Sequence, residues 1–250
     1  MFLSFASERL EVDLRNASRD PLIDFTSPIA GSPDRVEVTR DGLLIRQGRD
    51  KKGVTKRDTG FKFLLSGSGG FEVSLDLKKV KLEEPSSGWG QGLIFSLWLD
   101  DPEQSVLQVC LLALPGSGVS IRAKKIGRNV KIPMRKNVNI DFDSGKFVIS
   151  RTGTLASFSV ANGTKETKVF EAECGSRDIQ SISVWCTRQD QGNTPAEYLL
   201  RSLAVKADGF YSYQKTAYWF TWWHGMSLTF LAVFVVAVFL KLRADRIANS

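Results

Sequence analysis

The sequence predicts an all-β fold, an antiparallel jelly-roll sandwich, followed by one C-terminal transmembrane α-helix. Short runs of β-branched and aromatic residues recur along most of the chain, and turn sequences such as SGSGG, PGSG and NGT separate them. No long amphipathic helix pattern interrupts these runs. A long apolar tract then closes the chain. Many short strands without helices between them favour a sandwich over an α/β fold.

Two segments indicate how the predicted strands are buried. In FEVSLDL, residues 71–77, apolar side chains alternate with Glu72, Ser74 and Asp76, which is typical of a strand with one buried and one solvated face. In SVLQVCLLAL, residues 105–114, both faces are apolar. We therefore expect residues 105–114 to lie near the middle of the sandwich.

The apolar tract is long enough to cross a bilayer. No residue from Phe220 to Leu240 is charged, and a helix needs about 20 such residues to span the hydrocarbon core. From Leu228 onward the tract has no polar face, which favours lipid contact over a soluble core helix. We predict a transmembrane helix over 218–242. The expected interfacial residues are Tyr218, Trp219, Trp222, Trp223, Lys241 and Arg243.

The predicted organisation is an N-terminal lead-in (1–19), one β-sandwich (20–209), a juxtamembrane linker (210–217), the membrane helix (218–242) and a short basic tail (243–250). Two signals disagree about which side of the membrane holds the sandwich. The basic residues after the helix slightly outnumber those before it, which favours a cytoplasmic C-terminus and an exported sandwich. The N-terminal MFLSFAS is too short for a secretory signal, so the chain is tail-anchored if Met1 is the true start.

Composition restricts the chemistry. The only histidine, His224, lies in the apolar tract, which removes Ser-His and Cys-His catalysis from the soluble part. We expect no cofactor and no metal. The net charge of +7 is compatible with binding to anionic lipid, and the basic stretches at 46–57 and 122–136 lack the interleaved aromatic residues of nucleic-acid binders. The partners expected are therefore the lipid bilayer and a glycan or envelope protein, with no nucleic acid.

The three cysteines allow one disulfide. Cys110 lies in an apolar run and is expected to be a buried hydrophobic residue. Cys174 and Cys186 flank a predicted strand, and neighbouring strands could bring them together into a bridge, although sequence alone does not establish the geometry.

Two carboxylate pairs are candidate sites. Glu72 and Asp76 share a strand face, but ~13 Å between their Cα atoms is long for a glycosidase pair. Asp141 and Asp143 could supply part of a Ca²⁺ site, and the turn before Gly145 explains them as well. We interpret the first pair as a solvated strand face and the second as turn residues.

The order of several segments resembles a planctomycete domain family of unknown function. The segments are DGLLI, GFEVSLDL, EEPSSGWGQGLIFSLWLDD, GKFVISRTGTLASFSVANG and ISVWCTRQDQGNTPAEYLLRSLAVKADG, between about Pro21 and Gly209. The resemblance implies a concanavalin A-like, laminin-G-like jelly roll and assigns no catalytic residue. The opening also resembles the keto-disaccharide hydrolase-like domains of the same fold, and the chain departs from them where their catalytic acids and ring-binding aromatic residues are expected.

Together these observations predict a membrane-anchored, lectin-like binding or scaffolding module without catalytic activity. Trp89 and Trp98 are the candidate ligand-binding residues, because their flat rings can stack on sugars. Trp98 alternates with Leu97 and Leu99, so its side chain lies either on the surface or in the core. The alternatives are a glycoside hydrolase-like enzyme on the same fold and a structural envelope protein.

Overall fold

The structure is a computed structural model that describes residues 8–25, 36–47, 58–88, 90–127, 134–139, 141–188 and 195–212. Trp89 and most of the basic stretch at 46–57 lie outside the described residues, and so does the predicted membrane segment with its interfacial residues. Within the described ranges, no helix has the length and apolar character needed to cross a bilayer.

The described residues form fifteen strands and one short 3-10 helix. In chain order these elements are β1 (Glu8–Asp13), η1 (Leu14–Arg19), β2 (Ile23–Asp24), β3 (Val36–Thr39), β4 (Gly42–Gln47), β5 (Asp58–Phe63), β6 (Leu65–Leu82), β7 (Gln91–Leu99), β8 (Val106–Leu114), β9 (Gly118–Ile126), β10 (Met134–Val138), β11 (Ser144–Thr152), β12 (Leu155–Asn162), β13 (Lys165–Glu173), β14 (Ile179–Arg188) and β15 (Ala196–Ser212). The prediction of an all-β fold is confirmed.

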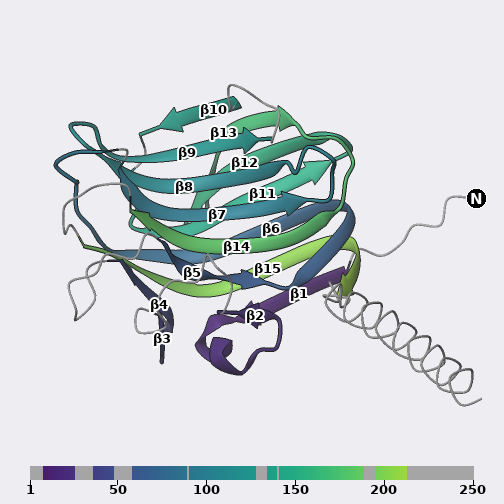
Figure 1. Ribbon diagram of the computed structural model, residues 1–250, viewed down its shortest axis with the longest axis horizontal. Helices are drawn as coiled ribbons and strands as arrows, with labels where there is room; N and C mark the ends of the chain where they lie inside the picture. Colours follow the sequence, from purple (N-terminus) through teal and green to yellow (C-terminus); the bar gives the residue numbers. More distant parts are fainter. Residues whose placement is uncertain are drawn as a thin grey trace, which may run out of the picture. The chain divides into compact units, whose positions relative to one another are not determined.

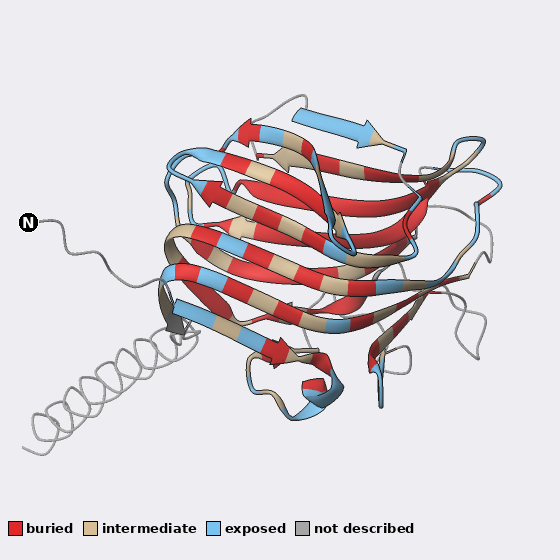
Figure 2. Cartoon of the chain, turned by 180° about the vertical axis from the view of Figure 1, so that it is seen from behind, coloured by how far each residue is buried: buried red, intermediate tan, exposed pale blue. Residues whose placement is uncertain are grey.

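The strands form two antiparallel layers. The front sheet has the order β10-β9-β8-β7-β14-β5-β2 and faces the viewer in Figure 1. The back sheet has the order β13-β12-β11-β6-β15, with β1 and β4 on the free edge of β15 and β3 beyond β4. Figure 2 shows the back sheet from outside, where buried and exposed residues alternate along each strand. Among the described residues, the two sheets are connected by one strand-pairing contact, between Ile179 of β14 and Gly67 of β6.

The core lies between the two sheets. The alternation predicted for residues 71–77 is confirmed, because Phe71, Val73, Leu75 and Leu77 are buried while Glu72 points outward from β6. The segment from Val106 to Ala113 is buried throughout, in a strand of the front sheet between β7 and β9, so both of its faces are covered, as the apolar sequence predicts. Burial of these apolar side chains is the main stabilising contribution to the fold.

The back sheet begins earlier and ends later than the predicted sandwich of 20–209. Residues 8–13, placed in the lead-in by the sequence, form β1 and pair with Ser202–Ala207 of β15. Strand β15 continues to Ser212, three residues past the predicted boundary at 209. Pairing between strands so distant in the chain leaves no local sequence signal, and it makes β1 part of the back sheet.

Arg151, the arginine of the RTG segment, is buried although it is charged. Its side chain is 3% exposed and donates hydrogen bonds to the carbonyl oxygens of Arg177 and Gly69. The guanidinium carbon lies 4.6 Å from the centre of the Phe71 ring. Burial lowers the pKa of Arg151. The side chain thereby ties β11 to β6 and to the loop that enters β14.

The disulfide considered between Cys174 and Cys186 is not formed. Both residues, and also Cys110, are buried thiols that take part in no disulfide. Cys186 lies in β14 of the front sheet between Thr59 and Leu93, whereas Cys174 follows β13 at the far edge of the back sheet. Cys110 is 1% exposed, as predicted, and burial raises the pKa of its thiol to about 11.

Candidate functional site: the outer face of the front sheet

A row of polar side chains crosses the outer face of the front sheet. Strand pairing places one residue from each of six neighbouring strands at the same level. In order across β9, β8, β7, β14, β5 and β2, the residues are Lys124, Gln108, Ser96, Ser183, Lys62 and Asp24. Their neighbours along the strands, such as Phe95, Leu97 and Val184, face the core. We call these six residues the polar row.

The centre of the polar row is buried. Ser96 and Ser183 are fully buried, and Gln108 is 6% exposed. Within the part of the chain that the structure describes, Ser96 Oγ and Gln108 Oε1 have no hydrogen-bond partner. A buried polar atom without a partner costs ~1–3 kcal/mol, so native proteins contain few of them. Side-chain oxygens of the same kind occur elsewhere among the described residues, for example at Ser105 and Ser120, so these two oxygens alone do not mark a ligand site.

Two tryptophans flank the polar row on opposite sides. Trp98 lies two residues from Ser96 on β7, and Trp185 lies two residues from Ser183 on β14. Because β7 and β14 are antiparallel with Ser96 opposite Ser183, the two tryptophans lie on either side of the row. The strand geometry puts their Cα atoms ~14 Å apart. Trp98 Nε1 donates a hydrogen bond of 3.0 Å to Ser183 Oγ, which fixes its ring against the row.

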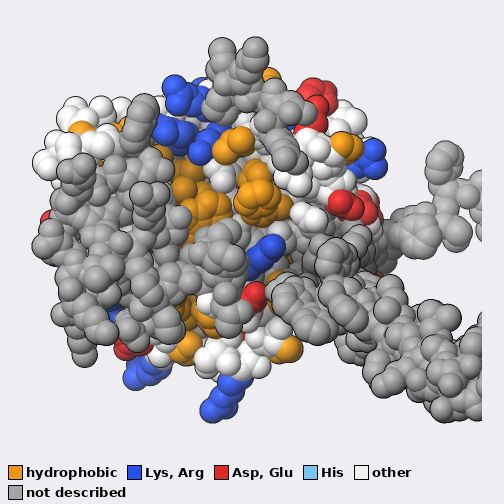
Figure 3. All heavy atoms as spheres, in the orientation of Figure 1, with side chains coloured by type: hydrophobic (Ala, Val, Ile, Leu, Met, Phe, Trp, Pro, Cys, Tyr) orange, Lys and Arg blue, Asp and Glu red, His pale blue; other side chains and the backbone are white. Residues whose placement is uncertain are grey.

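An apolar patch adjoins the row on the Trp185 side. Ile94, Cys110 and Leu112 pack together there, with Leu114 and Trp185 against them. This cluster is separate from the main core, because its side chains point away from the back sheet. Figure 3 shows hydrophobic side chains gathered on this face of the molecule. The outer face of the front sheet therefore combines hydroxyl and amide groups, aromatic rings and an apolar surface.

One of the two predicted ligand-binding tryptophans, Trp98, lies on this face. Its side chain is on the outer surface of β7 and not in the core, which decides the question that the sequence left open. The second, Trp89, lies outside the described residues. Trp185 was not predicted as a site residue from the sequence. In β14, Ser181, Ser183 and Trp185 alternate with apolar residues, and this pattern indicates that the three side chains share the outer face of the strand.

The predicted carboxylate pairs lie elsewhere. Glu72 and Asp76 are on the outer face of β6 in the back sheet, where Asp76 Oδ1 accepts a 3.3 Å hydrogen bond from Arg201. Asp143 lies at a turn, with its carboxylate 3.0 Å from Lys79 Nζ. Among the described residues, no group of three or more metal-ligating side chains is placed to hold an ion.

The comparisons with known proteins identify the fold. The sequence matches no protein-family model, and no curated protein is significantly similar to it. Among solved structures, an apo Crh5 transglycosylase superposes with a TM-score of 0.56 at 13% identity, covering 84% of this chain and 89% of that one. A structure described as a native glycosidic hydrolase gives a TM-score of 0.53 at 12% identity over 82% and 98%. A legume lectin-like domain from Entamoeba histolytica gives 0.51 at 12% identity over 85% and 99%.

These neighbours contradict the expectation of a module without catalytic activity. The similar structures include proteins named as a transglycosylase and as glycoside hydrolases, and also a lectin-like domain. Both enzymes and binding domains therefore have this fold. The absence of an obvious acid pair in the sequence was therefore a poor reason to exclude an enzyme. The described part of the chain has the jelly-roll fold that glycoside hydrolases, transglycosylases and lectin-like domains share.

Proposed function

We propose that this chain is a carbohydrate-active protein that holds a glycan on the outer face of the front sheet. The observation that carries the proposal is the position of Trp98 and Trp185 on either side of the polar row, on the outer face of the front sheet. Sugar hydroxyl groups both donate and accept hydrogen bonds, so a bound glycan can pair with the groups of the row that reach the surface, such as the half-buried Lys124.

The flanking residues suit the other surfaces of a sugar. Sugar rings have apolar faces, and the flat rings of Trp98 and Trp185 offer apolar surface with a polar edge on either side of the row. Lys62 lies opposite Ser183 on β5, and Lys124 lies opposite Gln108 on β9. The ammonium groups of both lysines can donate hydrogen bonds to sugar oxygens. The arrangement fits a glycan chain of several sugar units better than a single sugar.

We propose cleavage or transfer of the bound glycan as a second function. Proteins of this fold named as transglycosylase and glycoside hydrolase favour it. Such reactions use two carboxyl groups ~5 to 9.5 Å apart. Among the six residues of the polar row, Asp24 is the one carboxylate, and strand pairing places it directly opposite Lys62. Asp24 is therefore our candidate for one member of the acid pair.

A glycan array followed by calorimetry tests the binding proposal. We expect the chain to bind at least one class of oligosaccharide. The Trp98→Ala and Trp185→Ala variants should each bind about fivefold or more weakly, since stacking on an aromatic side chain contributes on the order of 1 kcal/mol or more. Trp219→Ala is a matched tryptophan control in the predicted membrane segment. Failure to bind any glycan, or full affinity in both front-sheet variants, would contradict the proposal.

Chromatography of the bound oligosaccharides after incubation tests the second function. We expect shorter products, or longer ones if the chain transfers sugar units, and we expect Asp24→Asn to lower the turnover rate while leaving binding detectable. If wild-type protein binds a glycan and returns it unchanged at every pH from 4 to 8, cleavage and transfer are refuted and the binding proposal stands.

A further inference from the structure

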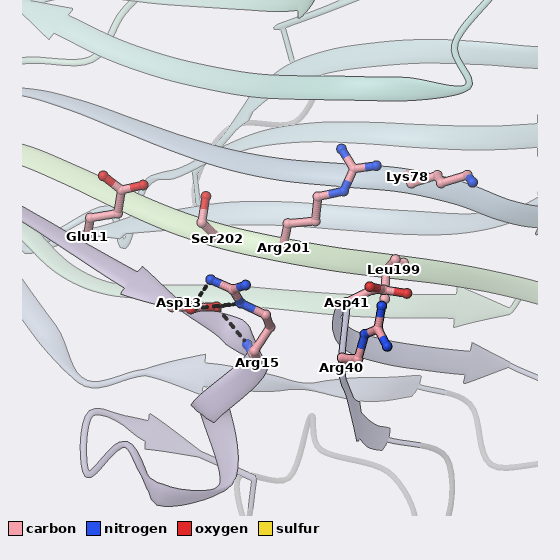
Figure 4. A pocket seen from close by; sticks show the side chains of 9 residues that line it. All are labelled: Glu11, Asp13, Arg15, Arg40, Asp41, Lys78, Leu199, Arg201 and Ser202. Carbon is pink, nitrogen blue, oxygen red and sulfur yellow. Dashed lines mark hydrogen bonds and ion pairs between the residues drawn. The ribbon is translucent and has the colours of Figure 1, made fainter.

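A cavity of about 620 Å³ lies on the opposite side of the molecule, at the outer face of the back sheet. Its lining residues are Glu11, Asp13, Arg15, Arg40, Asp41, Lys78, Leu199, Arg201 and Ser202, which Figure 4 shows. They come from β1, η1, the β3–β4 turn, β6 and β15. This volume is within the range of small-ligand sites. We call it the back pocket.

The back pocket is formed where β15 changes partners. On one edge of β15, Leu200 pairs with Leu43 of β4, and Ser202 pairs with Asp13 of β1. Arg201 falls between these two pairs, and the pairing of β15 with β6 also shifts register at this residue. A β-bulge of this kind re-aims a side chain, and bulges are frequent beside functional sites. The bulge directs the Arg201 guanidinium onto the outer face, 3.3 Å from Asp76.

The β3–β4 turn closes the other side of the back pocket. A side chain at Gly42, which has φ of +144°, would place its Cβ 2.2 Å from the carbonyl oxygen of Leu200. Only glycine allows the turn to approach β15 this closely. The hydroxyl of Thr39 donates to the Gly42 carbonyl oxygen at 2.8 Å and holds the turn. Arg40 and Asp41 are thereby fixed beside Leu199 and Arg201, as Figure 4 shows.

The charges of the back pocket are only partly compensated within the protein. Asp13 binds Arg15 through both carboxylate oxygens, and this hydrogen bonding lowers the pKa of Asp13. Arg40 and Lys78, by contrast, have no ion pair with any residue in the described ranges. Two cations without an ion-pair partner among the described residues therefore line the same cavity, Arg40 from the β3–β4 turn and Lys78 from β6.

We propose that the back pocket binds an acidic sugar, a ring that carries one carboxylate or sulfate group together with several hydroxyls. The guanidinium of Arg40 and the ammonium of Lys78 would bind the anionic group. Glu11 Oε2 accepts a 3.0 Å hydrogen bond from Arg9, so its Oε1 atom and the Asp41 carboxylate would accept hydrogen bonds from sugar hydroxyls. Leu199 offers an apolar contact for the ring. A compact polyanion such as phosphate fits less well, because Glu11 and Asp41 would repel it without gaining hydrogen bonds.

Calorimetric titration of the full chain with glucuronic acid, glucose 6-sulfate and glucose tests this site. We expect one or both anionic sugars to bind and glucose to bind at least about tenfold more weakly, because it lacks the charge-assisted contacts. The glucuronate and sulfate titrations distinguish the two sources of the negative charge. Binding should weaken as the salt concentration rises, since Arg40 and Lys78 are exposed.

Two sets of variants locate the binding. Arg40→Ala and Lys78→Ala should each weaken binding of the anionic sugar about tenfold or more, whereas Lys206→Ala, an exposed cation elsewhere on β15, should leave it unchanged. Trp98→Ala should also leave binding of the anionic sugar unchanged. The experiments can therefore refute the back pocket proposal without refuting the front-sheet proposal, or refute the front-sheet proposal without refuting the back pocket proposal. Unaltered affinity in the Arg40→Ala/Lys78→Ala double variant, or glucose binding as tight as glucuronate binding, would overturn the inference.

Discussion

Replacing Arg151 with methionine tests whether the buried guanidinium holds β11 to β6 and to the start of β14. The change keeps most of the side-chain volume but removes the two hydrogen bonds to Gly69 and Arg177 and the contact with the Phe71 ring. Each hydrogen bond from a charged donor contributes ~1.5–3 kcal/mol, and the ring contact ~0.5–1 kcal/mol. Relief from burying a charge offsets part of this sum.

The expected balance is a loss of about 2–4 kcal/mol in the free energy of unfolding, because Gly69 is only half-buried and water can replace part of its bond. Urea denaturation followed by tryptophan fluorescence measures it, as a lower midpoint at an unchanged slope. Lys146→Met, an exposed cation on the same strand, is the control and should change stability by less than about 0.5 kcal/mol. A loss below about 1 kcal/mol for Arg151→Met would refute the proposed structural role.

Three further predictions concern stability. Burial raises the pKa of Cys110 from 9.0 to about 11, so the folded state holds its proton more tightly, and the free energy of unfolding should fall as the pH rises from 9 towards 11. Denaturation curves at these pH values should show a smaller fall in Cys110→Ala, and identical slopes would contradict the assignment. Gly92→Ala should lower stability by about 1 kcal/mol or more, because its Cβ would lie 1.9 Å from the Leu111 carbonyl oxygen, and an unchanged urea midpoint would argue against this register. Glu37→Gln should cost less than about 1 kcal/mol in the same assay, because the Glu37–Arg46 pair is exposed, and a larger loss would mean that the pair anchors β3.

Local patterns were sufficient to predict much of the fold. Apolar and polar residues alternate in 71–77, as the two-residue side-chain period of a half-buried strand requires, and β6 shows this alternating burial. Residues 106–113 are almost all apolar, and β8 is buried on both faces. The surface position of Trp98 could not be predicted in the same way. Leu97 and Leu99 face the core, but a strand buried on both faces would have the same sequence pattern, so only the packing of β7 decides the outcome.

Neither candidate site could be predicted, because each depends on pairing between distant segments. The polar row requires Ser96, Gln108 and Ser183 to be in register across strands, and β14 enters the sheet between β7 and β5 from far along the chain. The back pocket requires the bulge at Arg201 and the pairing of β1 with β15. Register is determined by the packing of the whole sheet, and a single sequence does not reveal it.

The most direct test of glycan binding on the front sheet is an NMR titration that follows the indole N–H signals of the tryptophans. Trp98 Nε1 donates to Ser183 at the centre of the polar row, so a glycan bound there must change its surroundings. We predict that the Trp98 and Trp185 signals shift with the same saturation curve as the calorimetric binding isotherm. Binding that saturates while both signals remain unshifted would contradict the proposal that the polar row holds the glycan.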